Sequence, residues 1–110
     1  MSRAAFKVMF MLAAQNDLRS VYTWVYRNDS KQAARKLLEE LKRACENLQT
    51  MPERGHVPPE LQLVNVRRYL EIHWKHFRII YEIMDEKVYI HAVLDGRRSV
   101  QELLLERLLR

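Results

Sequence analysis

Glycine, proline and cysteine are all scarce in this sequence. Its 110 residues include two glycines, three prolines and one cysteine. So few chain-breaking residues leave little room for linkers or disordered segments, and we expect a single folded domain over residues 1–110. The single Cys45 excludes an internal disulfide and fits a reducing compartment. Because it falls on the apolar stripe of a predicted helix, we expect a buried structural thiol.

A long hydrophobic run is also lacking. The most apolar stretch, AAFKVMFMLAA, is too short to span a bilayer, and no signal-peptide pattern opens the chain. We therefore expect a cytoplasmic protein with no membrane partner. The chain is basic, with 19 Lys and Arg against 14 Asp and Glu and a net charge of +5. This charge favours a nucleic acid or an acidic protein as partner, although a soluble domain that is merely basic fits it equally well.

Hydrophobic periodicity predicts an α+β domain of element order β-α-α-β-β-β-α. In it, a helical hairpin packs on one face of a small, mostly antiparallel sheet. Asp29 and Gln32 have the spacing of a capping box at the start of the second helix. The expected elements are a central strand over residues 5–11, a helix over 13–27, a second helix that stops at Met51-Pro52, a loop over Pro52 to Gln62, strands over 66–74, 77–84 and 87–95, and a leucine-rich helical tail.

Two-residue turns between the last three strands set their register. The expected pairs are Trp74–Phe77, Ile72–Ile79 and Leu70–Tyr81, then Ile83–Val88, Tyr81–Ile90, Ile79–Ala92 and Phe77–Leu94. Every pair is apolar or aromatic, so we expect this face to be the core beneath the helices. The opposite face is then expected to be open and basic, and to carry Tyr69, Glu71, His73, Arg78, Ile80, Glu82, Tyr89, His91, Val93 and Asp95.

The histidines of this face allow two interpretations. His73 is expected opposite Arg78, and His91 one strand further over. An imidazole near a guanidinium is suited to phosphodiester cleavage, because histidine transfers protons and arginine holds the scissile phosphate. Alternatively, these residues are ordinary polar cross-strand neighbours, and Glu71 and Glu82 neutralise nearby cations. For each histidine taken singly, the second interpretation is favoured.

The arginines favour a binding role. Asp95-Gly96 turns the chain, and two adjacent guanidiniums follow that repel each other and contribute nothing to a core. An acidic partner or a phosphate is therefore expected near them. A structural alternative pairs Arg98 with Glu102 at helical spacing, which leaves Arg97 unexplained. The predicted binding residues are Arg67, Arg68, Arg78, Arg97 and Arg98.

The sequence predicts neither a metal site nor a cofactor. His73, His76 and His91 are expected on different strands or in a turn, without the spacing of a typical metal motif. His56 lies in the Pro- and Gly-bearing loop, where we expect it to be exposed to solvent.

One long segment resembles a known family. The sequence NVRRYLEIHWKHFRIIYEIMDEKVYIHAVLDGRRSVQELL, with the preceding LQTMPERGHVPPEL, is similar to the RelE/ParE family of type II toxin–antitoxin toxins. The strand FRIIYEI and the segment VLDGRRS carry most of this likeness. The resemblance implies a growth-inhibiting cytoplasmic bacterial toxin of the kind found in plasmid stabilisation modules. It also implies an antitoxin, encoded beside it, that neutralises the toxin and binds operator DNA through its own domain.

The resemblance leaves two targets open. RelE-like members cut mRNA on the ribosome, and ParE-like members inhibit DNA gyrase. Arg78 and Arg98 match arginines of the RelE-type pattern, but Tyr69 and Glu71 stand near its strand lysines, and Leu104 near its terminal tyrosine. The prediction is therefore a ParE-like gyrase inhibitor that is not an enzyme. The alternatives are an mRNA endoribonuclease, with His73, Arg78, His91 and Arg98 as candidate catalytic residues, and an inert family member.

Overall fold

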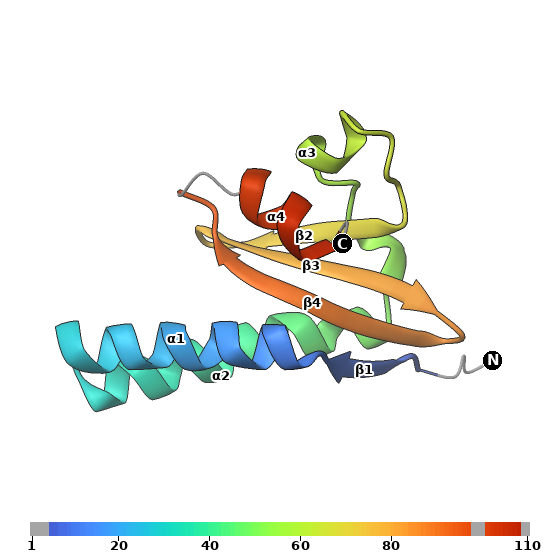
Figure 1. The fold of residues 1–110 in the computed structure, drawn as a ribbon. Helices are drawn as coiled ribbons and strands as arrows, with labels where there is room; N and C mark the ends of the chain where they lie inside the picture. The colour runs from blue at the N-terminus through green and yellow to red at the C-terminus, as the bar shows by residue number, and fades with distance from the viewer. Residues whose placement is uncertain (1–4, 98–100, 109–110) are drawn as a thin grey trace.

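The computed structural model describes residues 5–97 and 101–108 as an α+β structure in layers (Figure 1). A helical hairpin lies on one side of a four-stranded sheet, and two short helices lie on the other (Figure 1). The predicted fold class is thereby confirmed. The elements are β1 (Lys7–Phe10), α1 (Leu12–Asn28), α2 (Lys31–Glu46), the 3₁₀ turns Asn47–Gln49 and Pro52–Arg54, α3 (Pro59–Gln62), β2 (Tyr69–Trp74), β3 (Phe77–Met84), β4 (Lys87–Asp95) and α4 (Gln101–Leu108).

The helical hairpin forms where the sequence predicts it, but its second helix begins and ends differently. Ser30, not Asp29, is the N-cap of α2, and its side chain accepts a hydrogen bond from the Ala33 backbone N–H. The predicted capping box of Asp29 and Gln32 is therefore wrong, because the residue three positions after Ser30 is Ala33, which cannot return a side-chain hydrogen bond. α2 ends at Glu46 rather than at Met51-Pro52, because the chain tightens into a 3₁₀ turn before the proline.

The first strand is not central. The strand order is β1-β4-β3-β2, so β1 lies at an edge and pairs in parallel with β4 alone. The three later strands form an antiparallel meander joined by tight turns, and β1 pairs with the edge of this meander formed by β4. Four residues of β1 match the first four of β4, and the rest of β4 extends beyond it.

The predicted register is confirmed for the first hairpin and for half of the second. All three expected pairs of β2 and β3 occur, and in β3 and β4 Tyr81 faces Ile90 as expected. Beyond that pair the prediction is wrong, because Ile80 faces Ala92 and His91 becomes an extra residue in β4. Such a β-bulge reverses the faces of every later residue on the strand.

The bulge helps to build a second core on the side expected to be open. The core beneath the helical hairpin contains Ala14, Leu18, Leu41, Cys45, Leu48, Ile72, Phe77, Ile79, Tyr81, Val88, Ile90 and Val93. Two of the reversed residues of β4, Ala92 and Leu94, instead join a second cluster with Leu61, Tyr69, Ile80, Leu104 and Leu108. The prediction of an open, basic face is thus corrected, because α3 and α4 cover this side of the sheet with their leucines (Figure 1).

The C-terminal helix is held to the sheet by a partly buried ion pair near the bulge. The Val93 N–H, beyond the end of β1, donates to the Asp17 carboxylate at 2.9 Å. Arg107 of α4 donates to the same carboxylate at 3.0 Å and to the His91 carbonyl at 2.9 Å. Burial raises the pKa of Asp17, although the hydrogen bond from Val93 and the positive charge of Arg107 oppose that shift. One carboxylate therefore connects α1, β4 and α4.

Candidate functional site

The predicted site residue Arg78 lies inside a cluster of charges between β2, β3 and α3. Its guanidinium donates to Glu71 from Nε at 2.6 Å, and to Glu60 of α3 from both terminal nitrogens at 2.7 Å. The Arg78 side chain is 12% exposed and that of Glu71 1%. Hydrogen bonds from Arg78 lower the pKa of Glu60, and those to Glu60 and Glu71 raise the pKa of Arg78. Two carboxylates thus engage all three nitrogens of this arginine.

Two histidines complete this charge cluster, which comprises His56, Glu60, Glu71, His73 and Arg78. The Nε2 atoms of His56 and His73 lie 3.2 and 3.3 Å from the two Glu71 oxygens. Their rings meet edge to face, with centroids 5.5 Å apart. Ligand atoms of His56, Glu71 and His73 lie within 4.8 Å of one another, a geometry that suits a metal ion.

The other histidine predicted as a candidate catalytic residue, His91, lies elsewhere on the sheet. His91 sits at the bulge, where its Nε2 lies 3.0 Å from Glu82 and its ring meets Tyr69 edge to face. Tyr69 pairs with Glu82 at the start of β2, and His73 pairs with Arg78 near its end. The structure therefore keeps His91 apart from the charge cluster instead of combining the two histidines.

The predicted arginine set is also dispersed. Arg67 and Arg68 are exposed just before β2, and the Arg68 guanidinium lies over the Tyr69 ring at 4.9 Å. Arg97 follows β4 at the other end of the sheet. The six residues of β2 separate it from Arg67 and Arg68, which corresponds to about 20 Å. It binds its neighbour Asp95 through its Nη2 at 2.8 Å. Arg98 lies outside the described residues.

A groove runs between β1 and the helical hairpin. Apolar side chains of β1, α1 and α2 line it together with two cations. In the described part of the chain, β1 has a strand neighbour on one side alone. On its outer edge the Phe6 N–H donates to the Gln49 carbonyl and the Phe10 carbonyl accepts from the Gln15 side chain, which leaves the Val8 backbone between them without a strand partner from the described residues beside this groove. Large apolar side chains are exposed nearby in sequence, with Met11 at 40% and Leu12 at 69%. The groove-lining residues used below are Val8, Phe10, Leu18, Arg19, Tyr22 and Lys42.

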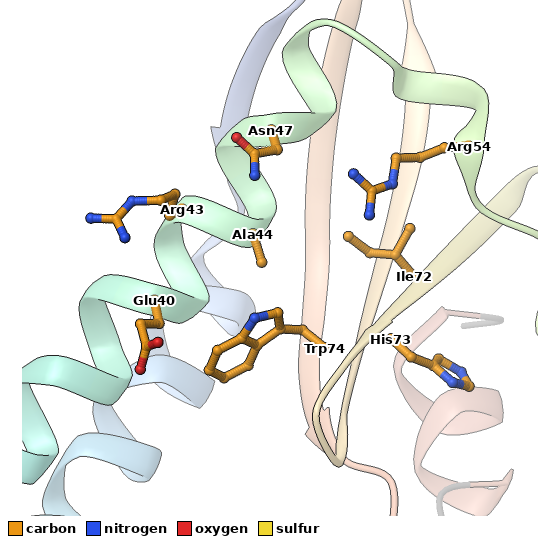
Figure 2. Close-up of a pocket in the computed structure, with 8 residues that line it drawn as sticks. All are labelled: Glu40, Arg43, Ala44, Asn47, Arg54, Ile72, His73 and Trp74. Carbon is orange, nitrogen blue, oxygen red and sulfur yellow. The ribbon is translucent and has the colours of Figure 1, made fainter.

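A smaller cleft separates α2 from β2. Figure 2 shows Arg54 pointing into this cleft above Ile72, with the Trp74 ring beneath Ala44, while His73 points away on the other side of the strand. Arg43 lies on the outer side of α2 (Figure 2). Its lining is mixed, with Glu40 beside Arg43 and Arg54, and it lies on the side of β2 from which the His73 side chain points away.

Cys45 confirms the prediction of a structural thiol. It is free and fully buried in the core beneath the hairpin, and burial raises its pKa to about 12. At neutral pH the thiol is therefore protonated and does not act as a nucleophile.

Sequence reasoning missed Glu60 and the partnership of His56. His56 is exposed, as expected, but an isolated bridge of two backbone hydrogen bonds holds it against Glu71. Gly55 makes this approach feasible, since a Cβ there would lie 2.5 Å from the Tyr81 hydroxyl. The one sequence signal was the glycine itself, in a loop that otherwise read as irregular.

Solved structures share this fold. The ParDE toxin–antitoxin structure from P. aeruginosa matches with a TM-score of 0.68 and 14% identity, covering 81% of this chain and 94% of that one. The RelBE2 complex from Mycobacterium tuberculosis matches with a TM-score of 0.63 and 17% identity, covering 86% and 94%. An arginine-to-alanine double mutant of the E. coli toxin RelE, in the free state, matches with a TM-score of 0.61 and 19% identity, covering 96% and 97%. The architecture is therefore that of the RelE/ParE-like toxins.

The sequence then places the chain within that class. Residues 8–100 match the family model of the ParE toxin of the type II toxin–antitoxin system parDE. The chain belongs to this family. No curated protein matches the sequence. None of the described helices is long and apolar enough to cross a membrane.

Proposed function

We propose that this chain is a toxin that inhibits DNA gyrase and that a cognate antitoxin neutralises it in the cytoplasm. The match to the ParE toxin model supports this function over 93 of the 110 residues. In this proposal the toxin acts by binding, without a catalytic residue of its own. The exposed arginines Arg67, Arg68 and Arg97 contact gyrase or its bound DNA, and operator DNA is bound through the antitoxin.

The observation that favours a gyrase inhibitor over an mRNA endonuclease is the pairing of Arg78 with two carboxylates. An mRNA endonuclease would need this guanidinium for the scissile phosphate, yet Glu60 and Glu71 hold it in a pocket where it is 12% exposed. A phosphate would have to displace two carboxylates from a low-dielectric site, which costs free energy. The open arginines outside the cluster are better suited to an acidic partner.

The groove beside β1 is the proposed antitoxin site. An extended segment can hydrogen-bond to the free edge of β1 and place alternate apolar side chains against Val8, Phe10 and Leu18. Arg19 and Lys42 at the same groove favour acidic residues in that segment. This arrangement would cover apolar surface that is exposed in the free toxin.

One observation favours the RelE-like alternative. His73 is 56% exposed, and Glu71 orients its imidazole beside Arg78, as a general acid or base requires. In that case the reaction would be ribosome-dependent mRNA cleavage, with His73, Arg78, His91 and Arg98 as the candidate residues. Because His91 lies apart from the charge cluster, His73 would then need another residue as its catalytic partner.

The decisive experiment compares both targets. Full-length toxin, freed of antitoxin, is tested in parallel for inhibition of gyrase supercoiling and for cleavage of mRNA on ribosomes. We expect lost supercoiling with accumulated cleaved DNA–gyrase complexes, and intact mRNA. Added antitoxin should restore supercoiling. Cut mRNA with unaffected gyrase would establish the alternative, and silence in both assays would indicate an inert member or another target.

Arginine variants test which part of the toxin surface binds gyrase. Arg67→Ala with Arg68→Ala, and separately Arg97→Ala, should weaken gyrase inhibition at least several-fold. The matched control is Arg35→Ala on the exposed face of α2, which should inhibit as the parent does. His73→Gln should leave gyrase inhibition unchanged, whereas it should abolish mRNA cleavage under the alternative.

A further inference from the structure

We infer that His56, Glu71 and His73 form a binding site for a divalent transition-metal ion of the Zn²⁺ type. Imidazole nitrogens and a carboxylate oxygen are the donor set that zinc accepts, and three protein ligands leave a fourth position for water. The three side chains come from a loop and from two positions of β2. The inference is independent of whether the toxin acts on gyrase or on mRNA.

The distances already match such a site. A tetrahedral zinc ion with bonds of about 2.0–2.1 Å keeps its ligand atoms roughly 3.3 Å apart. Nε2 of His56 lies 3.2 Å from Oε2 of Glu71, and Nε2 of His73 lies 3.3 Å from Oε1 of the same carboxylate. One ligand atom from each of the three residues lies within 4.8 Å of the other two. The two imidazoles need to approach each other by a small side-chain rotation, which their exposure permits.

Backbone structure brings the ligands together before any metal binds. Glu71 and His73 are two residues apart on β2, so their side chains share one face. His56 is fixed to the same strand, since its N–H donates to the Glu71 carbonyl at 3.1 Å and its carbonyl accepts from the Glu71 N–H at 2.7 Å. The close approach at Gly55 keeps this loop against the sheet.

Charge also favours a cation at this point. The guanidinium of Arg78 faces the two carboxylates of Glu60 and Glu71, which leaves one net negative charge when the imidazoles are neutral. A carboxylate has about four lone-pair sites, of which Arg78 takes two at Glu71. The remaining two face the histidines. A metal ion can therefore bind without displacing Arg78, which then orients the ligating carboxylate.

Solvent can reach the site. The side chains of His56 and His73 are 60% and 56% exposed, whereas Glu71 is 1% exposed. The ion thus has an open entry path on the histidine side and a buried anion behind it. Bound metal would join the loop that carries His56 to β2, so it should stabilise the folded chain.

The test is a zinc titration of the full-length toxin without a histidine tag, followed by competition with a chromophoric chelator. We expect one Zn²⁺ per chain. His56→Gln and His73→Gln should each weaken zinc affinity at least about ten-fold, because even the loss of a residue that only supports a metal ligand weakens affinity by about that factor. The chain has four histidines, and the control His76→Gln lies in the exposed β2–β3 turn and should bind zinc as the parent does.

Two further readouts make the result unambiguous. Zinc should raise the melting temperature of the parent and of His76→Gln, reversibly with chelator, and at the same zinc concentration should raise that of His56→Gln and His73→Gln by less. Co²⁺ in place of zinc should give the visible absorption of a four-coordinate ion. Equal zinc affinity in all four proteins, or loss of binding in His76→Gln alone, would overturn the inference. Glutamine replaces exposed rings, so circular dichroism should confirm that each variant folds.

Discussion

Glu71 holds a negative charge at 1% exposure, with four side-chain nitrogens around its two oxygens. Burial of a carboxylate costs several kcal/mol unless partners replace the lost water, and here Arg78 and two imidazoles do so. The same residue fixes the guanidinium, orients His73 and receives the loop at His56. Stability and any chemistry of the charge cluster therefore depend on this one side chain.

Replacement of Glu71 by Gln should destabilise the fold. The amide cannot accept both hydrogen bonds from Arg78, which keeps Glu60 as its remaining anion. We expect a loss of about 2–3 kcal/mol in the free energy of unfolding, measured by urea denaturation. The control Glu39→Gln, on the exposed face of α2, should change it by less than about 0.5 kcal/mol. Equal midpoints for the two variants would contradict the role given to Glu71.

Arg97 has a testable electrostatic effect on its neighbour. Hydrogen bonds from Arg97 lower the pKa of Asp95 to about 2. In Arg97→Gln we expect the Asp95 carboxyl to titrate near its ordinary value of about 3.9, measured by NMR. Because the pKa is lowered in the folded state, the pair stabilises the protein above pH ~4 and loses this effect as the pH falls towards 2. The contribution is small, since Arg97 is 67% exposed. An unchanged Asp95 pKa would show that Arg97 is not bound there in solution and is free for a partner.

At the residue scale, the sequence predicted which residues face one another across neighbouring strands better than it predicted their contacts with the loop. Cross-strand logic placed His73 opposite Arg78 and assigned Glu71 to neutralise cations, and both predictions are confirmed. It could not find Glu60, which reaches Arg78 from a four-residue helix inside an apparently irregular loop. Contacts between a loop and a sheet depend on loop geometry, which hydrophobic periodicity does not report.

At the scale of elements, the largest difference between the predicted and the observed sheet comes from one extra residue in β4, the bulge at His91. The alternation of Val88 and Ile90 with polar neighbours predicts one apolar face, and Ala92 and Leu94 continue the same spacing. A bulge has no strong signal in such a run, because Ala92, Val93 and Leu94 are apolar on either face. The strand bounds of β3 and β4 were nevertheless predicted correctly, including the turn at Asp85 and Glu86, where both φ angles are positive as a type I′ turn requires.

The C-terminal helix should prove to be a structural element, and two neighbouring leucines test this. Leu104 is fully buried in the second core, whereas Leu103 is 38% exposed on the same helix. Leu104→Ala should lower the free energy of unfolding by about 2–5 kcal/mol through lost burial and a residual cavity. Leu103→Ala serves as the matched control, with a change below about 1 kcal/mol. If both variants unfolded at the parent midpoint, α4 would not be packed on the sheet in solution.

For the whole molecule, two covered faces of the sheet leave few sites where a partner can bind. The helical hairpin covers one face, and α3 and α4 cover the other (Figure 1). In the described chain, the open features include the edge of β1 with its groove, the smaller cleft between α2 and β2, and scattered exposed cations. The sequence predicted the excess of positive charge, but its expected location on an open sheet face was wrong. Topology, not composition, decided which surface remains available.

The excess charge predicts how fast an acidic antitoxin associates with the toxin. With a net charge of +5, association should slow about ten-fold when salt rises from about 0.05 to 0.5 M, while dissociation changes less. Stopped-flow measurements with the antitoxin encoded beside the toxin would test this. Arg19→Glu with Lys42→Glu, at the groove, should slow association further.

The control for this last prediction changes the net charge equally at another place. Arg67→Glu with Arg68→Glu removes the same positive charge from exposed positions just before β2, at the opposite edge of the sheet from β1 and its groove. Because screened charges act mainly within about 10 Å at 0.1 M salt, this pair should slow association much less than the groove pair. Equal slowing by both pairs would mean that overall charge steers the antitoxin, and faster association of the groove variant would contradict an acidic partner in the groove.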